Sequence, residues 1–114
     1  MSFLSALFPP TITPQEAHEA LRRREVVVLD VRERREWKAG HIAGSRNVPL
    51  GSLGTPPEGL AGRRTVTVCK SGARSRSAAA RLRRAGIDVV NLRGGMLAWQ
   101  RAGLPLDRRG GRVA

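Results

Sequence analysis

The sequence predicts a single α/β domain in which a central, mainly parallel sheet is covered by helices on both faces. Two observations carry this prediction. Short apolar runs rich in β-branched residues alternate along the chain with segments of helical composition. The clearest run, Val26-Val27-Val28-Leu29, has no polar residue at alternate positions, which is typical of a strand buried on both faces. A chain of 114 residues is long enough for one such domain and little more.

Four elements are expected in the first half of the chain. The capping box Thr13-Pro14-Gln15-Glu16 starts a helix that runs to about Arg23. The apolar run then forms a strand that ends in Asp30. Two shorter elements follow, a helix over residues 33–38 that stops at Gly40 and a strand over residues 45–48.

The second half of the chain repeats this alternation. A connection rich in glycine and proline spans residues 51–62, and a strand follows over residues 65–68. A helix over residues 75–85 is stopped by Gly86. The last strand and helix are expected at residues 89–92 and 96–102. We therefore predict an N-terminal extension over residues 1–10, the domain over residues 11–106, and a basic, flexible tail over residues 107–114.

Cys69, the single cysteine of the chain, is the candidate nucleophile. It follows a strand and precedes a helix, and Gly72 lies in the loop between them. Backbone N–H groups at the start of a helix favour negative charge, and the thiolate is the reactive form of cysteine. The loop is therefore predicted to hold an anion above a nucleophile, although position alone also fits an inert core cysteine. If both strands are parallel, Asp30 lies on the same edge of the sheet.

The formal net charge of +12 has two interpretations. It attracts small anions, nucleic acid or acidic proteins, or it belongs to a solvated surface. With two phenylalanines, two tryptophans and no tyrosine, the chain has little for base stacking, so we expect no nucleic-acid partner. No apolar stretch approaches the roughly 18 residues of a membrane helix, and no secretory signal is evident. We expect a cytoplasmic protein without a membrane partner.

Three segments carry patterns that occur together in one known family. Residues 29–49 contain D-x-R, a later E, and G-H-I-x-G-S-x-N-x-P. Residues 69–75 contain C-x-x-G-x-R-S, and residues 92–105 contain L-x-G-G, a later W, and G-x-P. In this order and spacing they make the chain resemble a single-domain rhodanese, a thiosulfate sulfurtransferase. The resemblance implies the family's three-layer fold.

The resemblance also implies sulfur transfer. Cys69 would take a sulfane sulfur from thiosulfate or another persulfide donor and pass it to a thiol or cyanide acceptor. Asp30 and Arg32 would support a loop that binds the anionic donor through Lys70, Ser71, Gly72, Ala73, Arg74 and Ser75. Four residues separate the cysteine from the loop arginine, whereas the phosphatases and arsenate reductases of this fold have five. No metal or organic cofactor is implied.

Side-chain pairings near the loop are expected as well. Arg74 either contacts the bound anion or folds back as a brace; the family comparison favours the brace, with Asp30 or Glu33 as partner. Arg32 and Glu36 are expected to pair locally. Ser71 and Ser75 can supply hydroxyls to the loop, and for Ser75 the role of a cap for the following helix is favoured. His41 is assigned a packing and hydrogen-bonding role.

A different function stays open at this point. The chain could be a sulfur-relay or regulatory module that works through a protein partner with little small-molecule turnover. The physiological donor and acceptor are not encoded in a recognisable motif, and a monomer and a homodimer are both compatible with the sequence.

Overall fold

The computed structural model describes residues 8–60 and 62–107. The strands are β1 (Thr11–Ile12), β2 (Val26–Asp30), β3 (Arg46–Asn47), β4 (Arg64–Val68) and β5 (Val89–Leu92). The helices are α2 (Pro14–Arg22), α3 (Arg34–Ala39), α4 (Ala73–Arg84) and α5 (Gly95–Arg101), with a 3-10 turn, η1 (Leu50–Ser52). Every predicted helix and strand is present within two residues of its predicted bounds. The two-residue strand β1 and the turn η1 were not predicted.

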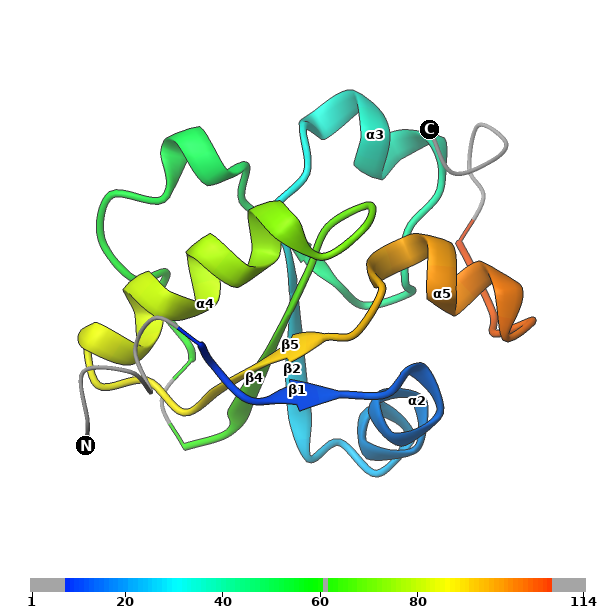
Figure 1. Cartoon of the computed structure of the whole chain (residues 1–114), viewed down its shortest axis with the longest axis horizontal. Coiled ribbons are helices and arrows are strands. Elements are labelled where there is room, and N and C mark those ends of the chain that lie inside the picture. Colours follow the sequence, from blue (N-terminus) through cyan, green and yellow to red (C-terminus); the bar gives the residue numbers. More distant parts are fainter. Residues whose placement is uncertain (1–7, 61, 108–114) are drawn as a thin grey trace.

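In the described part of the chain, five strands form one sheet in the order β1-β5-β4-β2-β3, and each neighbouring pair is parallel. Figure 1 shows α4 above this sheet and α2 below it. Helix α5 contacts α2, so these two helices share a layer. The predicted α/β class with a parallel sheet and helices on both faces is confirmed.

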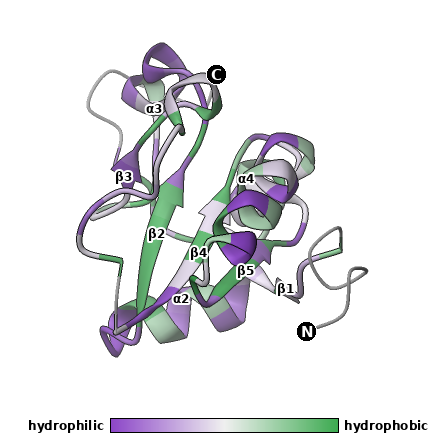
Figure 2. Ribbon diagram, turned by 90° about the vertical axis from the view of Figure 1, so that its left-hand side faces the viewer, coloured by the Kyte–Doolittle hydropathy of each residue, from purple (hydrophilic) through white to green (hydrophobic). Residues whose placement is uncertain are grey.

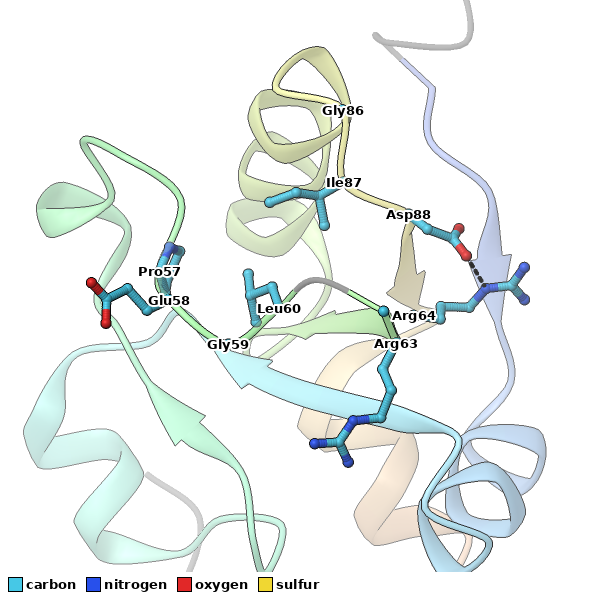
Figure 3. A pocket seen from close by; sticks show the side chains of 10 residues that line it. Pro57, Glu58, Gly59, Leu60, Arg63, Arg64, Gly86, Ile87 and Asp88 are labelled. Atoms are coloured by element: carbon cyan, nitrogen blue, oxygen red, sulfur yellow. Dashed lines mark hydrogen bonds and ion pairs between the residues drawn. The ribbon is translucent and has the colours of Figure 1, made fainter.

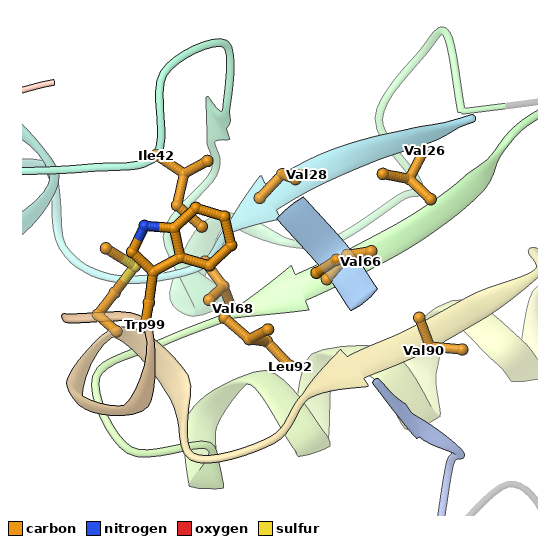
Figure 4. Packing of buried hydrophobic residues seen from close by; sticks show 10 residues of the cluster. Val26, Val28, Ile42, Val66, Val68, Val90, Leu92 and Trp99 are labelled. Carbon is orange, nitrogen blue, oxygen red and sulfur yellow. The ribbon is translucent and has the colours of Figure 1, made fainter. Parts of the chain in front are cut away.

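Two apolar clusters fill the space between the sheet and its helices. The first joins the sheet to α2 and α5, and Figure 4 shows valines of β2, β4 and β5 in one cluster with Trp99 and Ile42. The second lies beneath α4 and includes Leu29, Val89 and Leu82. All four residues of β5 are buried, as a strand covered on both faces requires. Coloured by hydropathy, the strands β2 and β5 form the apolar centre of the domain (Figure 2).

The end of the described chain packs back on the domain. Asp107 forms an antiparallel bridge with His41, through a bond from the Asp107 N–H to the His41 carbonyl (2.7 Å) and a reciprocal bond of 3.1 Å. Residues 108–114 of the predicted tail and residues 1–7 of the predicted extension lie outside the described residues. Within the described residues, no helix combines the length and the hydropathy that a membrane span requires.

Candidate active site

Parallel pairing of β2 and β4 brings the two predicted strand ends together. Asp30, the last residue of β2, is in register with Val68, the last residue of β4. Cys69 comes directly after Val68, so the thiol and the carboxylate lie on one edge of the sheet, as the two strand predictions require. Ligands of parallel α/β domains bind at this edge, outside the carboxyl ends of the strands.

The Cys69 thiol lies at the base of a closed loop. The residue is 1% exposed and belongs to the apolar cluster beneath α4. Its Sγ accepts the backbone N–H of Gly72 at 3.1 Å and the hydroxyl of Ser75 at 3.3 Å. Two donors aimed at one sulfur atom stabilise negative charge on it, and the start of α4 adds the positive end of a helix dipole. The arrangement therefore suits a sulfur atom that acts as a nucleophile.

The loop owes its shape to Gly72. Its φ of +116° lies in a region that favours glycine, and it occupies the position immediately before α4. Its carbonyl accepts the Ser75 hydroxyl at 3.2 Å, the Asn91 side-chain amide at 3.2 Å and the Arg76 N–H at 3.0 Å. The prediction that Ser75 caps α4 is wrong. Because Gly72 takes the cap position, the helix begins at Ala73, and the buried Ser75 hydroxyl lies inside the loop between Sγ and the Gly72 carbonyl.

The first turn of α5 holds the other side of the loop. The Met96 N–H donates to the Cys69 carbonyl at 2.8 Å, and the Leu97 N–H donates to the Lys70 carbonyl at 3.0 Å. Gly95 makes this close approach possible, because a Cβ there would lie 2.4 Å from the Cys69 carbonyl oxygen and 2.5 Å from that of Lys70. In the sequence, the glycine pair at residues 94 and 95 stood out only as part of the L-x-G-G pattern. Its signal was present in the sequence, but its contact with the loop depends on the adjacency of β4 and β5.

Arg74 braces the loop against α3. Its two terminal nitrogens donate to the Glu36 carboxylate, at 2.7 Å to Oε1 and 3.0 Å to Oε2. These hydrogen bonds lower the pKa of Glu36 to about 2, and the carboxylate in turn raises the pKa of Arg74. The brace is confirmed, but the predicted partners, Asp30 and Glu33, are wrong. Asp30 is already paired elsewhere, and the Glu33 side chain accepts a backbone bond at the start of α3.

Asp30 and Arg32 form a fully buried ion pair next to the loop. The Arg32 Nε lies 3.0 Å from both carboxylate oxygens, and Nη2 lies 2.8 Å from Oδ2. Nη2 also donates to the Gly40 carbonyl at 2.7 Å, which ties the end of α3 to β2. The predicted pair between Arg32 and Glu36 is wrong, because Asp30 takes the guanidinium. Asp30 therefore organises the edge of the sheet rather than facing the thiol as a base.

The remaining predicted site residues face solvent. Lys70, Ser71 and Ala73 of the loop are exposed.

His41 is buried just after the end of α3, away from solvent. Its ring stacks on Trp37 at 3.7 Å, and its Nδ1 lies 2.7 Å from the Trp37 carbonyl oxygen. This agrees with the packing role assigned to His41.

A hollow of about 650 Å³ lies at the opposite edge of the sheet, beside the amino ends of β4 and β5. Leu60 and Ile87 are among its lining residues. The ion pair of Arg64 with Asp88, 3.2 Å long, closes one side of it (Figure 3). Because Cys69 follows the carboxyl end of β4, this hollow is separated from the thiol by the length of the strand.

The fold and the loop together define a class of proteins: parallel α/β domains that hold a cysteine thiol in a loop between the end of a strand and the start of a helix. Within this class, the chain belongs to the rhodanese-like domain family, whose model matches residues 13–102.

Individual relatives agree with this assignment. The uncharacterized protein slr1261 of Synechocystis is 38% identical over 97 residues, which cover 83% of this chain and 54% of that protein. The thiosulfate sulfurtransferase GlpE of Actinobacillus succinogenes is 35% identical over 98 residues, covering 84% of this chain and 88% of that protein. The crystal structure of a rhodanese-related protein from Thermoplasma volcanium matches with a TM-score of 0.79 at 30% identity, covering 86% of this chain and 97% of the other. The chain thus spans about half of slr1261 and most of the other two.

Proposed function

We propose that this protein is a sulfurtransferase that carries a sulfane sulfur as a persulfide on Cys69. The observation that carries the proposal is the environment of the thiol, whose Sγ accepts both the Gly72 N–H and the Ser75 hydroxyl. Membership of the rhodanese-like family and similarity to a protein named thiosulfate sulfurtransferase support the same conclusion.

The reaction consists of two displacements at sulfur. In the first, the Cys69 thiolate attacks the sulfane sulfur of thiosulfate; a bond forms from Sγ to that sulfur, the S–S bond of thiosulfate breaks, and sulfite leaves with the electron pair. In the second, a thiolate or cyanide attacks the outer sulfur of the persulfide. The bond to Sγ breaks, the Cys69 thiolate is restored, and the acceptor leaves as a persulfide or as thiocyanate.

The position of Arg74 supports sulfur rather than phosphate as the cargo. Both terminal nitrogens of its guanidinium are bonded to Glu36, so they are directed away from an anion in the loop. A tetrahedral phosphate requires more hydrogen-bond donors than a single sulfur atom does, and the Gly72 N–H and the Ser75 hydroxyl are both already bonded to the Sγ of Cys69. We infer that the loop holds one transferable sulfur.

The test is intact-mass spectrometry of the purified chain after incubation with thiosulfate. Wild type should gain the mass of one sulfur atom and should release it as thiocyanate when cyanide is added. Cys69→Ser should do neither, whereas Ser77→Ala, a change of an exposed serine in α4, should behave as wild type. A wild-type protein that forms neither product, or that hydrolyses an aryl phosphate through Cys69, would overturn the proposal.

A second function within the same chemistry is a sulfur relay. Cys69 is the single cysteine of the chain, so the acceptor must come from outside it. Slow turnover with thiosulfate beside rapid sulfur exchange with a partner protein would identify the relay. A thiol that must stay reduced suits a reducing compartment, and we propose a cytoplasmic location on that ground.

A further inference from the structure

Helix α4 has an outward face of arginines that no acidic residue neutralises. The helix contains five arginines and no aspartate or glutamate. Arg74 pairs with Glu36 and Arg83 donates to the Val89 carbonyl. The guanidinium groups of the other three, Arg76, Arg81 and Arg84, have no ion-pair or hydrogen-bond partner among residues 8–60 and 62–107.

Arginines without an ion pair also occur elsewhere in the described chain, but α4 gathers three of them on one helix that has no acidic residue, and α2 offers a contrast. Arg22 and Arg23, at the end of α2, both contact Glu19, at 3.8 Å and 3.1 Å. Like charges three or four residues apart destabilise a helix, and α4 carries Arg81 and Arg84 at that spacing. The row on α4 is thus positive charge that stays available to an outside partner.

The three side chains border a groove. One hollow of about 330 Å³ is lined by Arg76, Ala80, Arg81 and Arg84 together with Ser77. A second hollow of about 210 Å³ shares Arg81 and Arg84 and extends to the loop over residues 53–56. We call these two adjoining hollows the α4 groove.

The floor of the α4 groove on its far side is apolar. Leu53, Pro56 and Leu82 line it; the leucines are only 5% and 2% exposed, so the exposed Pro56 supplies most of the accessible apolar surface. The groove therefore offers positive charge along one wall and an apolar contact centred on Pro56 at one end.

This chemistry indicates what the groove binds. Arg76 and Arg84 are eight residues apart, about 12 Å along a helix, which is too far for one small anion to contact both. The lining residues include no aromatic side chain on which a base could stack. We propose that the α4 groove is the docking surface for an acidic segment of a partner protein, with several carboxylates for the arginines and at least one apolar side chain for the floor.

The groove begins at the active-site loop. Helix α4 starts at Ala73, directly after the loop, and the Arg76 N–H donates to the Gly72 carbonyl at 3.0 Å. Figure 1 shows α4 leading away from the loop along one face of the domain. The end of the groove at Arg76 therefore lies about one helical turn from the active-site loop. That this partner gives or receives sulfur rests on the proposed function; the docking itself does not.

The test is a fluorescence-anisotropy titration of the full chain with a labelled synthetic peptide of glutamate and leucine residues, about 14 residues long so that it spans the groove. The variant Arg76→Gln/Arg81→Gln/Arg84→Gln should bind it at least about tenfold more weakly than wild type. The matched control, Arg24→Gln/Arg63→Gln/Arg101→Gln, removes the same charge from other exposed sites and should stay within about twofold of wild type. A peptide with glutamine in place of leucine should also bind more weakly.

Three results would overturn the docking proposal. They are equal weakening in both triple variants, binding that ignores the leucines, and tighter arginine-dependent binding of a single-stranded RNA or an anionic vesicle of matched charge. Persulfide formation from thiosulfate is measured on the same variants and should be unchanged in all of them. If wild type binds the peptide and forms no persulfide, the docking stands and the proposed function fails; if it forms persulfide and ignores the peptide, the docking fails alone.

Discussion

Arg74 and Glu36, which are 38 residues apart in the sequence, meet in a two-point ion pair with distances of 2.7 and 3.0 Å. The pair links the active-site loop to α3. The Glu36 side chain is 13% exposed and that of Arg74 is 37% exposed, so the contact is partly shielded from water. The pair holds the loop in position against α3, while the Gly72 N–H and the Ser75 hydroxyl donate hydrogen bonds to the Cys69 sulfur within the loop.

Replacing Glu36 by glutamine should loosen the loop. The guanidinium of Arg74 would keep a weaker, uncharged acceptor, and we expect persulfide formation from thiosulfate to slow by about tenfold. Stopped-flow measurement of the first half-reaction checks this. Glu25→Gln, an exposed acid without a partner in the described chain, is the control; equal rates in the two variants would contradict the brace.

The same ion pair predicts a pH dependence of stability. Arg74 lowers the pKa of Glu36 from 4.5 to about 2 in the folded protein. The unfolded chain therefore takes up this proton at a higher pH than the folded chain. The stabilisation is complete above pH 4.5 and is lost as the pH falls toward 2. Because Arg74 is more than a third exposed, we expect about 1–2 kcal/mol rather than the full value of the shift.

Urea denaturation of wild type and Glu36→Gln at a series of pH values measures this contribution to stability. The difference in free energy of unfolding between the two proteins should shrink as the pH falls from 4.5 toward 2. A difference that is the same at every pH would mean that the carboxylate does not stabilise the fold through its charge.

Gly95→Ala should destabilise the protein by more than its backbone conformation alone explains. The new Cβ would lie 2.4 Å from the Cys69 carbonyl oxygen, so α5 must move away from the loop. We expect a loss of about 2–4 kcal/mol, together with slower persulfide formation. Gly103→Ala is a matched control, because its φ of +70° is close to the +60° of Gly95 and nothing lies within 4 Å of its Cβ. The control should lose about 1 kcal/mol.

Ser75→Ala should make the thiol less reactive without unfolding the domain. A hydrogen bond to a charged group contributes about 1.5–3 kcal/mol, so alkylation of Cys69 by iodoacetamide at neutral pH should slow by about tenfold or more. Ser77→Ala removes an exposed hydroxyl from the same helix and should alkylate at the wild-type rate. An alkylation rate in Ser75→Ala equal to that of wild type would show that the Ser75 hydroxyl donates to the Gly72 carbonyl and does not affect the thiol.

Asp30→Asn should be among the most destabilising single changes at this edge of the sheet. It leaves the Arg32 guanidinium charged and fully buried, which costs about 3–5 kcal/mol. Asp88→Asn, which breaks the exposed pair with Arg64, should cost less than about 1 kcal/mol. Chemical denaturation measures the free energy of unfolding of both variants. Equal losses of stability would contradict the claim that burial makes the Asp30–Arg32 pair costlier to break than the exposed Arg64–Asp88 pair.

Local patterns in the sequence were sufficient to predict most of the fold. The capping box at Thr13 is formed with both of its hydrogen bonds, because it depends on four consecutive residues. The apolar run that ends at Asp30 was enough to place that carboxylate on the edge shared with Cys69. The two-residue strand β1 was not predicted.

The side-chain pairings of the site could not be predicted in the same way. Asp30, Glu33 and Glu36 are all close to one another in the sequence, and which of them pairs with Arg74 depends on where α3 comes to lie. That position follows in part from the buried bond of Arg32 to the Gly40 carbonyl, which no spacing in the sequence reveals. The role of Gly95 likewise depends on the contact between two segments that are separated by the whole of α4.

The burial of Cys69 has a consequence for what other proteins can reach. With the residue 1% exposed, two folded copies of the chain cannot bring their thiols to the 2 Å of a disulfide bond, so the resting domain is protected from cross-linking through its single cysteine. A sulfur atom bound to Sγ lengthens the side chain by about the same 2 Å. In the proposed reaction the cargo itself is therefore the part of the side chain that a second protein touches, and an empty domain and a loaded one present different surfaces.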